Sequence, residues 1–202
     1  MKRFLPCLFL LLLLTGGCAA GDAQEPNSSQ GSEYYPLAKG NRWIYRVRTA
    51  GRAGSSKVEW RVTSEKRSKE GEIYQVWPTP MESDEDAMVL RVTPAGIQET
   101  TDRVLILRSH PVSGDAWTSG EASWSAPRKF RVLSVHRPCR AGPVTSGDCV
   151  QVEDQDENLH LRTITTYARG VGPVRYEYFR GSPAGSAPTQ TVELVSYELS
   201  SK

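Results

Sequence analysis

The 202-residue chain lacks the residue patterns on which most catalytic and metal sites depend. It has only three histidines, His110, His136 and His160, and no two of them are spaced like the ligands of a metal ion. The sequence contains no His-Glu-x-x-His run and no Gly-x-Ser-x-Gly turn of the kind that exposes a nucleophilic serine. We therefore predict that the protein is not an enzyme and has no catalytic residue, metal site or cofactor.

The mature chain is also expected to have no excess of one charge. The full sequence has 25 Lys and Arg against 23 Asp and Glu, but Lys2 and Arg3 lie in a segment that we expect to be removed. A nucleic-acid-binding protein normally has a basic excess or a clustered basic stripe. Because the sequence shows neither, it argues against nucleic acid as a partner.

No apolar run is long enough to span a bilayer. The run Phe4 to Leu14 has 11 residues, whereas a transmembrane helix needs about 20. With Lys2 and Arg3 before it and small residues after it, the run is typical of a secretory signal peptide. The sequence therefore predicts export.

The end of this run, Leu14-Thr15-Gly16-Gly17-Cys18, resembles a bacterial lipobox, since small residues directly precede a cysteine. Cleavage there would make residues 1–17 a lipoprotein signal peptide. Cys18 would then receive acyl chains such as palmitate, which bind the membrane with about 0.8 kcal/mol per buried methylene. Thr15 stands where Leu is more usual, and the alternative is a plain signal peptide in which Cys18 is incidental.

Two further expectations concern the location of the mature protein. Ala19 rather than Asp follows the cysteine, which in a Gram-negative cell favours the outer membrane, with the protein facing the periplasm. Residues 18–33 contain no large apolar side chain and are predicted to be the acylated cysteine and a disordered tether. The ends of such a tether would lie roughly 20 Å apart.

Short runs of alternating polarity predict an all-β, single domain over residues 34–200. Trp43, Tyr45 and Val47 alternate with arginines, and 17 Gly and 13 Pro supply turns. We expect about eleven antiparallel strands in one strongly curved sheet or barrel, leaving the Ser/Gly-rich stretch 117–124 unassigned. The expected strands are 42–49, 57–63, 72–77, 88–93, 96–100, 104–108, 129–137, 149–153, 159–168, 171–180 and 189–199.

Several short motifs occur twice in the same order. Gly-Asn-Arg-Trp43 matches Gly-Asp-Ala-Trp117, and the two tryptophans are 74 positions apart. Three more pairs follow: Lys57 to Val62 with Lys129 to Val132, Gly71 to Val76 with Gly147 to Val152, and Arg91 to Ile97 with Tyr167 to Pro173. This order predicts one β-unit used twice, as residues 34–108 and 109–200.

The repeated motifs resemble a family of small bacterial envelope lipoproteins with a duplicated β-unit, sometimes labelled TapB-like. The resemblance covers Tyr34 to Leu199 and implies an antiparallel, barrel-like β-domain with no established activity. It depends on Tyr35-Pro36-Leu37, Gly40, Trp43 and Tyr45, on Pro111, Gly114-Asp115 and Trp117, and on Tyr167-Ala168, Gly170-Val171-Gly172, Val174 and Glu193 to Tyr197.

Cys139 and Cys149 are predicted to form a structural disulfide. They flank a Gly- and Pro-containing loop between two expected strands, in a chain expected to reach an oxidising compartment. A redox role would more naturally use a Cys-x-x-Cys pair, which is absent.

Two acidic clusters follow related strands of the two units. Oxygen-rich loops can hold Ca²⁺, but neither cluster has the EF-hand spacing, so we expect solvated turns and no metal. The clusters are Glu82, Asp84, Glu85 and Asp86, and Glu153, Asp154, Asp156 and Glu157.

Nine aromatic side chains could line a ligand-holding cavity: Trp43, Trp60, Trp77, Trp117, Trp124, Tyr45, Tyr74, Tyr176 and Tyr178. Four of them are the candidate ligand-binding residues, namely Trp43, Trp60, Tyr45 and Tyr176. On a curved sheet such residues either fill the core or line a cavity. We expect an exported, lipid-anchored envelope protein with a non-enzymatic binding or structural role, facing an envelope protein partner. The alternative is a carrier or sensor of a hydrophobic envelope molecule on the concave face of the sheet, which requires a cavity rather than a filled interior.

Overall fold

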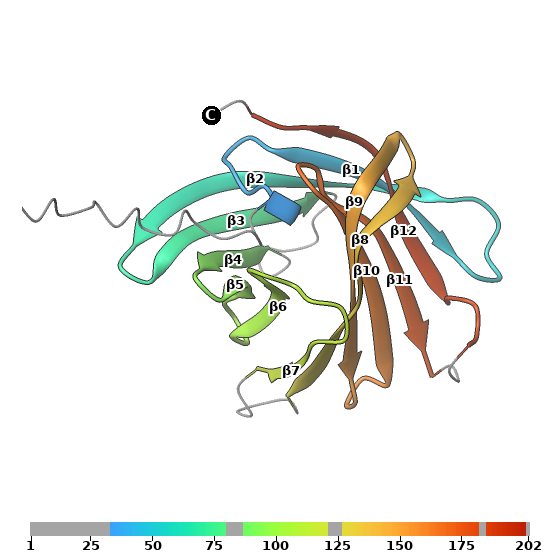
Figure 1. The fold of residues 1–202 in the computed structure, drawn as a ribbon. Coiled ribbons are helices and arrows are strands. Elements are labelled where there is room, and N and C mark those ends of the chain that lie inside the picture. The colour runs from blue at the N-terminus through green and yellow to red at the C-terminus, as the bar shows by residue number, and fades with distance from the viewer. Residues whose placement is uncertain (1–32, 80–86, 121–126, 182–184, 201–202) are drawn as a thin grey trace, which may run out of the picture.

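The computed structural model describes residues 33–79, 87–120, 127–181 and 185–200, and these form one sheet of twelve antiparallel strands. The strand order is β6-β5-β4-β3-β2-β1-β12-β11-β10-β9-β8-β7, so each half of the chain forms a meander and the first strand pairs with the last (Figure 1). The predicted signal peptide, Cys18, residues 19–32 of the predicted tether and the acidic loop 82–86 lie outside the described residues. The last residue of the predicted tether, Glu33, is described and forms an ion pair with Arg169 at 2.6 Å.

The strands divide into six before and six after residue 110. The first six are β1 (Arg42–Thr49), β2 (Ser56–Ser68), β3 (Gly71–Thr79), β4 (Met88–Thr93), β5 (Gly96–Glu99) and β6 (Val104–Arg108). The last six are β7 (Ala116–Ser119), β8 (Arg128–Ala141), β9 (Val144–Asp156), β10 (Leu161–Ala168), β11 (Gly172–Arg180) and β12 (Gln190–Glu198).

The prediction of an all-β fold with one strongly curved sheet is confirmed, and the sheet is a nearly closed barrel. The additional strand relative to the prediction is β7, in the Ser/Gly-rich stretch that lacks a clear alternation. The strand predicted to end at Arg137 continues through Pro138 to Ala141. Pro138 falls within a register shift of the β8–β9 ladder, where a missing N–H group is tolerated.

Side chains bridge the seam between the two edge strands, β6 and β7. The backbone N–H of Leu105 donates to Ser119 Oγ at 2.7 Å, and Trp117 Nε1 donates to the Leu105 carbonyl oxygen at 2.8 Å. No ladder of backbone hydrogen bonds joins these two strands among the described residues. The barrel is therefore closed at this seam by side chains, which protect otherwise unpaired edges.

The interior is filled at one end by two segments. Tyr34, Tyr35 and Leu37 from the N-terminal segment are buried in the same core as Ala141 and Val144 from the tip of the β8–β9 hairpin. The hairpin tip also contacts β12, because the backbone N–H of Gly142 donates to Glu193 Oε1 at 3.2 Å. These contacts hold the hairpin against the barrel.

The turns that precede β1 and β7 make the same three hydrogen bonds. In the first turn, Gly40 N donates to Val62 O, Asn41 N to Ala38 O, and Val62 N to Asn41 O, at 2.9, 3.0 and 2.9 Å. The equivalent bonds of the second turn, at 2.9, 3.0 and 2.8 Å, join Gly114 to Val132, Asp115 to Val112, and Val132 to Asp115. The two halves thus share local geometry, whereas duplication of an ancestral unit stays a prediction.

This geometry corrects one of the motif pairs. Since Val62 and Val132 occupy equivalent places, Trp60 corresponds to Phe130, and the proposed alignment of Lys57 with Lys129 is wrong by two residues. The sheet register agrees, because Trp43 lies opposite Trp60 and Trp117 lies opposite Phe130.

Candidate functional site

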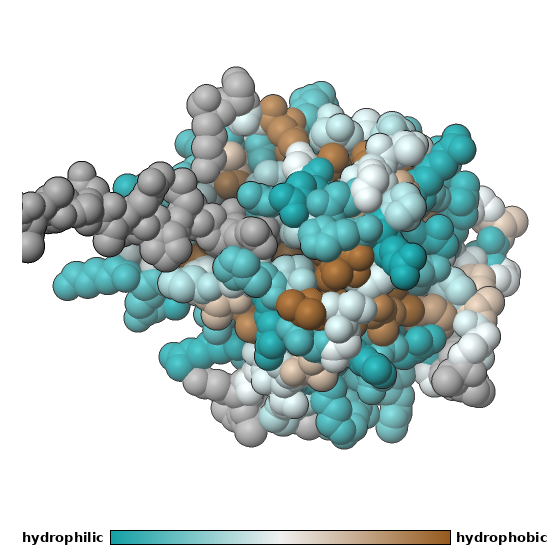
Figure 2. All heavy atoms as spheres, in the orientation of Figure 1, coloured by the Kyte–Doolittle hydropathy of each residue, from teal (hydrophilic) through white to brown (hydrophobic). Residues whose placement is uncertain are grey.

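A cavity of about 220 Å³ lies inside the barrel. Eight strands contribute to its wall, from both halves of the sheet: β2, β4, β5 and β6 on one side and β8 to β11 on the other, together with Tyr35 from the N-terminal segment. Figure 2 shows hydrophobic side chains grouped near the middle of the face seen in Figure 1, between β4–β6 and β10, with hydrophilic side chains around them.

Strand alternation explains which residues line the cavity. Successive side chains of a β-strand point to opposite faces, so every second residue of β10 points inward, including Thr163, Thr165 and Tyr167. Tyr176 and Tyr178 of β11 follow the same rule. The cavity wall therefore combines aromatic rings with hydroxyl groups.

The four aromatic residues proposed from the sequence divide into two pairs. Trp60 and Tyr176 line the cavity, and their ring centroids are 5.2 Å apart. Trp43 and Tyr45 do not line it but are fully buried in the core. Trp43 Nε1 donates to Val171 O at 2.7 Å and the Tyr45 hydroxyl donates to Pro173 O at 2.8 Å, so their polar groups are already paired.

Tyr178, one of the nine aromatic residues predicted as possible cavity residues, lines the cavity, whereas two other tyrosines of the wall, Tyr35 and Tyr167, were missing from that set. The alternation in β10 carried a signal for Tyr167, because this residue lies in phase with the inward-facing Thr163 and Thr165. Tyr35 precedes the first strand, so its place at the cavity depends on how the N-terminal segment packs.

The hydroxyl of Tyr35 is buried without a hydrogen-bond partner in the described part of the chain. The residue is 2% exposed, and burial raises the pKa of its hydroxyl, which remains protonated at neutral pH. An unpaired buried polar group costs about 1–3 kcal/mol. Such a group beside a cavity is a place where a bound molecule would gain a hydrogen bond.

Arg128 and Asp154 form an ion pair in the cavity wall. Arg128 Nε donates to Asp154 Oδ1 at 3.1 Å, and a second bond joins the guanidinium to Oδ2. Burial lowers the pKa of Arg128, but the hydrogen bond and charge of Asp154 outweigh this effect, and the pKa is raised. Burial raises the pKa of Asp154, and the hydrogen bond and charge of Arg128 act against this effect. Each group of the pair thus has its partner within the cavity wall.

Glu99, the remaining carboxylate at the cavity, also has partners. Its Oε1 accepts the backbone N–H of Thr101 at 2.8 Å, and its Oε2 accepts that of Asp102 at 3.1 Å. The charged groups of the cavity wall are thus paired within the protein.

The second acidic cluster is also distributed among ion pairs. Glu153 contacts Arg162 at 3.1 Å and Glu157 contacts Lys129 at 2.5 Å, while Asp154 faces Arg128.

Across residues 33–79, 87–120, 127–181 and 185–200, no group of three or more His, Cys, Asp or Glu could hold a metal ion. The same residues include no helix long and apolar enough to cross a membrane.

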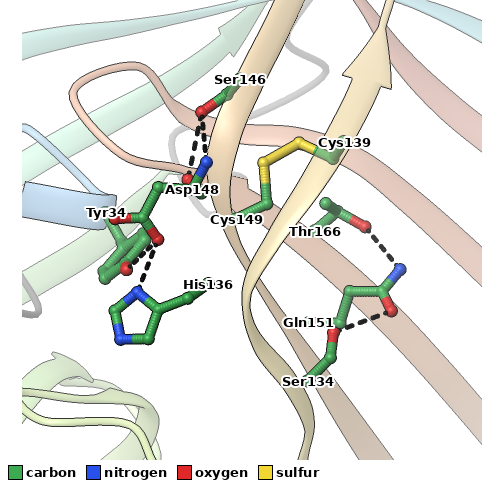
Figure 3. The surroundings of a disulfide bond; sticks show 9 residues. All are labelled: Tyr34, Ser134, His136, Cys139, Ser146, Asp148, Cys149, Gln151 and Thr166. Atoms are coloured by element: carbon green, nitrogen blue, oxygen red, sulfur yellow. Dashed lines mark hydrogen bonds and ion pairs between the residues drawn. A yellow bond between two sulfur atoms is a disulfide. The ribbon is translucent and has the colours of Figure 1, made fainter.

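The predicted disulfide is present and joins Cys139 of β8 to Cys149 of β9, with Cα atoms 6.0 Å apart. Figure 3 shows the adjacent carboxylate of Asp148, which accepts the Tyr34 hydroxyl at 2.7 Å and contacts His136 Nδ1 at 2.9 Å. Arg169 reaches the same carboxylate through Nε at 2.6 Å. These contacts fix the start of the described domain against the hairpin.

The fold and the cavity define an antiparallel β-barrel with a small internal site lined by aromatic, aliphatic and polar side chains. No protein-family model matches the chain, and no curated protein matches its sequence. The TapB-like resemblance therefore stays a prediction.

Two solved structures are similar to the described fold. One is a Bacteroides fragilis protein described as exported and as having a YmcC-like fold, with 10% identity, a TM-score of 0.49 and coverage of 80% of this chain and 97% of the other. The second is a Parabacteroides distasonis protein described as a lipoprotein, with 11% identity, a TM-score of 0.43 and coverage of 82% and 98%.

Proposed function

We propose that this protein is an exported, lipid-anchored protein of the bacterial envelope that binds a small, mainly hydrophobic molecule in its barrel cavity without transforming it. The observation that carries this proposal is the cavity itself, with an unpaired, buried tyrosine hydroxyl in its wall.

Export and anchoring are supported by the N-terminal sequence. Lys2 and Arg3, the apolar run and the small residues before Cys18 match a lipoprotein signal peptide. The Cys139–Cys149 disulfide fits an oxidising compartment such as the periplasm. Outer-membrane attachment follows from Ala19 by the sorting rule given above and is part of the proposal.

Binding rather than catalysis is supported by the composition of the cavity wall. No His, Cys, Ser or Lys lines the cavity among the described residues, and both carboxylates are paired. A general acid or base must be free to exchange a proton with a substrate. Asp154 and Glu99 are instead held by partners within the protein.

The size of the cavity supports a small ligand over a long acyl chain. Drug-sized ligands occupy pockets of about 300–1,000 Å³, and an engineered cavity of about 150 Å³ binds benzene. A volume of about 220 Å³ lies between these values. It suits one aromatic ring with a few additional atoms.

Uptake of indole by the soluble chain 19–202 tests the binding function. This chain includes every described strand and core residue, because all of them lie at or after Tyr34. We expect one indole to bind per protein in calorimetry, and we expect Thr163→Phe, which fills the cavity, to abolish binding. Thr145→Phe adds the same ring at an exposed position and should leave binding intact. Absence of indole binding, or binding that survives Thr163→Phe, would refute the cavity as the site.

Anchoring is tested separately in cells. Mass spectrometry of the exported full chain should show acyl chains on Cys18, and Cys18→Ser should release the protein from the membrane fraction. A membrane-bound Cys18→Ser protein without acyl chains would contradict the lipoprotein assignment.

A further inference from the structure

We infer that the ligand of this cavity is uncharged and carries a hydrogen-bond acceptor, such as a carbonyl oxygen, to which the Tyr35 hydroxyl donates. This inference rests on the proposed binding function and defines the chemical class of the ligand.

The charged groups of the wall disfavour an anionic ligand. Among the described residues that line the cavity, Arg128 has the only cationic side chain. Its Nε and one terminal nitrogen already bind Asp154. A ligand carboxylate would have to compete with Asp154 for this guanidinium while facing the negative charge of Glu99. Burying an additional charge without a free partner is costly, so the wall favours a neutral molecule.

The Tyr35 hydroxyl has no hydrogen-bond partner among the described residues. Its ring packs edge-on against Trp43, with centroids 5.8 Å apart, and lies 6.1 Å from the ring of Tyr167. These contacts, together with complete burial, hold the ring in place. The hydroxyl is therefore a fixed donor without a partner among the described side chains and backbone groups.

The Tyr35 hydroxyl keeps its proton, and so remains a donor, at neutral pH because burial and the neighbouring Tyr167 raise the pKa of Tyr35.

The rings of Tyr176 and Tyr178 are stacked with centroids 6.3 Å apart, and Trp60 lies beside them. A flat ligand would find aromatic surfaces along one wall and a donor at Tyr35. This combination suits an aromatic ketone, aldehyde, amide or ester.

Three probes of similar size distinguish the ligand classes. Acetophenone is neutral and has an acceptor, ethylbenzene lacks the acceptor, and benzoate is an anion. We would measure their affinities by calorimetry for the chain 19–202, for Tyr35→Phe, and for Tyr197→Phe as a control at an exposed position. We expect acetophenone to bind about ten-fold more tightly than ethylbenzene, which corresponds to one hydrogen bond. This preference should vanish in Tyr35→Phe and persist in Tyr197→Phe.

Stability of the empty protein provides an independent measurement. If Tyr35 is kept for a ligand, Tyr35→Phe should raise the midpoint of chemical unfolding while lowering acetophenone affinity, because it removes an unpaired buried hydroxyl. A structural tyrosine would instead lose stability on this change.

The possible outcomes distinguish failure of the proposed binding function from failure of the proposed ligand class. If none of the probes binds, both the binding function and the ligand class fail. If ethylbenzene binds as tightly as acetophenone, or if the preference survives Tyr35→Phe, the cavity still binds ligands but the role of Tyr35 is refuted. Tightest binding of benzoate would refute the inference that the ligand is uncharged.

Discussion

The indole N–H of Trp43 donates a hydrogen bond to the carbonyl oxygen of Val171, at 2.7 Å, across 128 residues of sequence. This bond joins β1 to the residue that precedes β11, and both partners are buried. It explains why Trp43 belongs to the core and not to the cavity. The next residue, Gly172, lies directly against the same indole.

The contact with Trp43 predicts that Gly172 tolerates no side chain. Gly172 has a φ of +108°, and a Cβ atom there would lie 3.2 Å from Trp43 Nε1. Gly170 also has a positive φ, +72°, but has open space around it. Gly172→Ala should therefore lose about 1–3 kcal/mol more than Gly170→Ala in the free energy of unfolding, measured with urea. Equal losses would show that the indole moves aside without cost.

The disulfide is expected to stabilise the domain by constraining the unfolded chain. Its cysteines are separated by 10 residues, and closing a loop of this size contributes about 2.5–3 kcal/mol in the chain-entropy model. Urea unfolding of chain 19–202 with and without reductant measures the effect. Cys139→Ser/Cys149→Ser should already have the lower stability and should not respond to reductant. A reductant effect in this double variant would mean that the loss has another source.

Asp148 should make stability depend on pH in the acidic range. Burial acts to raise the pKa of this carboxyl, but hydrogen bonds from Tyr34 and His136 and the charge of Arg169 outweigh it, and the pKa is lowered. A lowered folded-state pKa means that the ionised carboxylate stabilises the fold. The contribution of the ionised Asp148 to stability is complete when the pH is above the ordinary pKa of an aspartate, about 3.9. It is lost as the pH falls through the lowered pKa of the folded state.

Asp148→Asn measures this contribution. We expect the variant to be less stable than the wild type by about 1 kcal/mol at pH 7, and the difference to shrink below about pH 4. Asp102→Asn, at an exposed turn position, serves as the control and should show little difference at either pH. A constant deficit of Asp148→Asn from pH 7 to pH 2 would contradict the assigned role.

The seam between β6 and β7 predicts a local effect on hydrogen exchange. Because Ser119 Oγ accepts the Leu105 N–H, Ser119→Ala should speed exchange of the Leu105 amide by about ten-fold. Ile97 serves as the control, because it lies in β5 and pairs with Leu107 of β6. The exchange rate of its amide should not change in Ser119→Ala. Unchanged exchange at Leu105 would show that another group protects the seam.

The strands could be predicted because alternation of side chains is a local property of β-structure. Trp43 and Tyr45 face inward, as predicted from their alternation with the arginines of β1. The pairing of Cys139 with Cys149 was likewise local, since one hairpin contains both. The strand β7 escaped prediction because its four residues have no clear alternation and are held by Trp117 and Ser119 across the seam.

Phase along a strand tells which face a side chain occupies but not how deep in the barrel it lies. Trp43 and Trp60 are opposite each other in the sheet and both point inward, yet Trp60 lines the cavity while Trp43 is covered by Val171 and Gly172. Tyr35 of the N-terminal segment also packs against Trp43, so the difference depends on segments outside the two paired strands.

The β-architecture, and the prediction of export, therefore depend on patterns of neighbouring residues: the alternation, the turn glycines and the apolar run near the N-terminus. The cavity, its paired charges and the unpaired Tyr35 hydroxyl follow from contacts between residues far apart in the chain. Tyr35 meets Tyr167 because the pairing of β1 with β12 brings the first and last thirds of the chain together. No local pattern specifies such contacts, since they are set by sheet register and by the packing of the closed end.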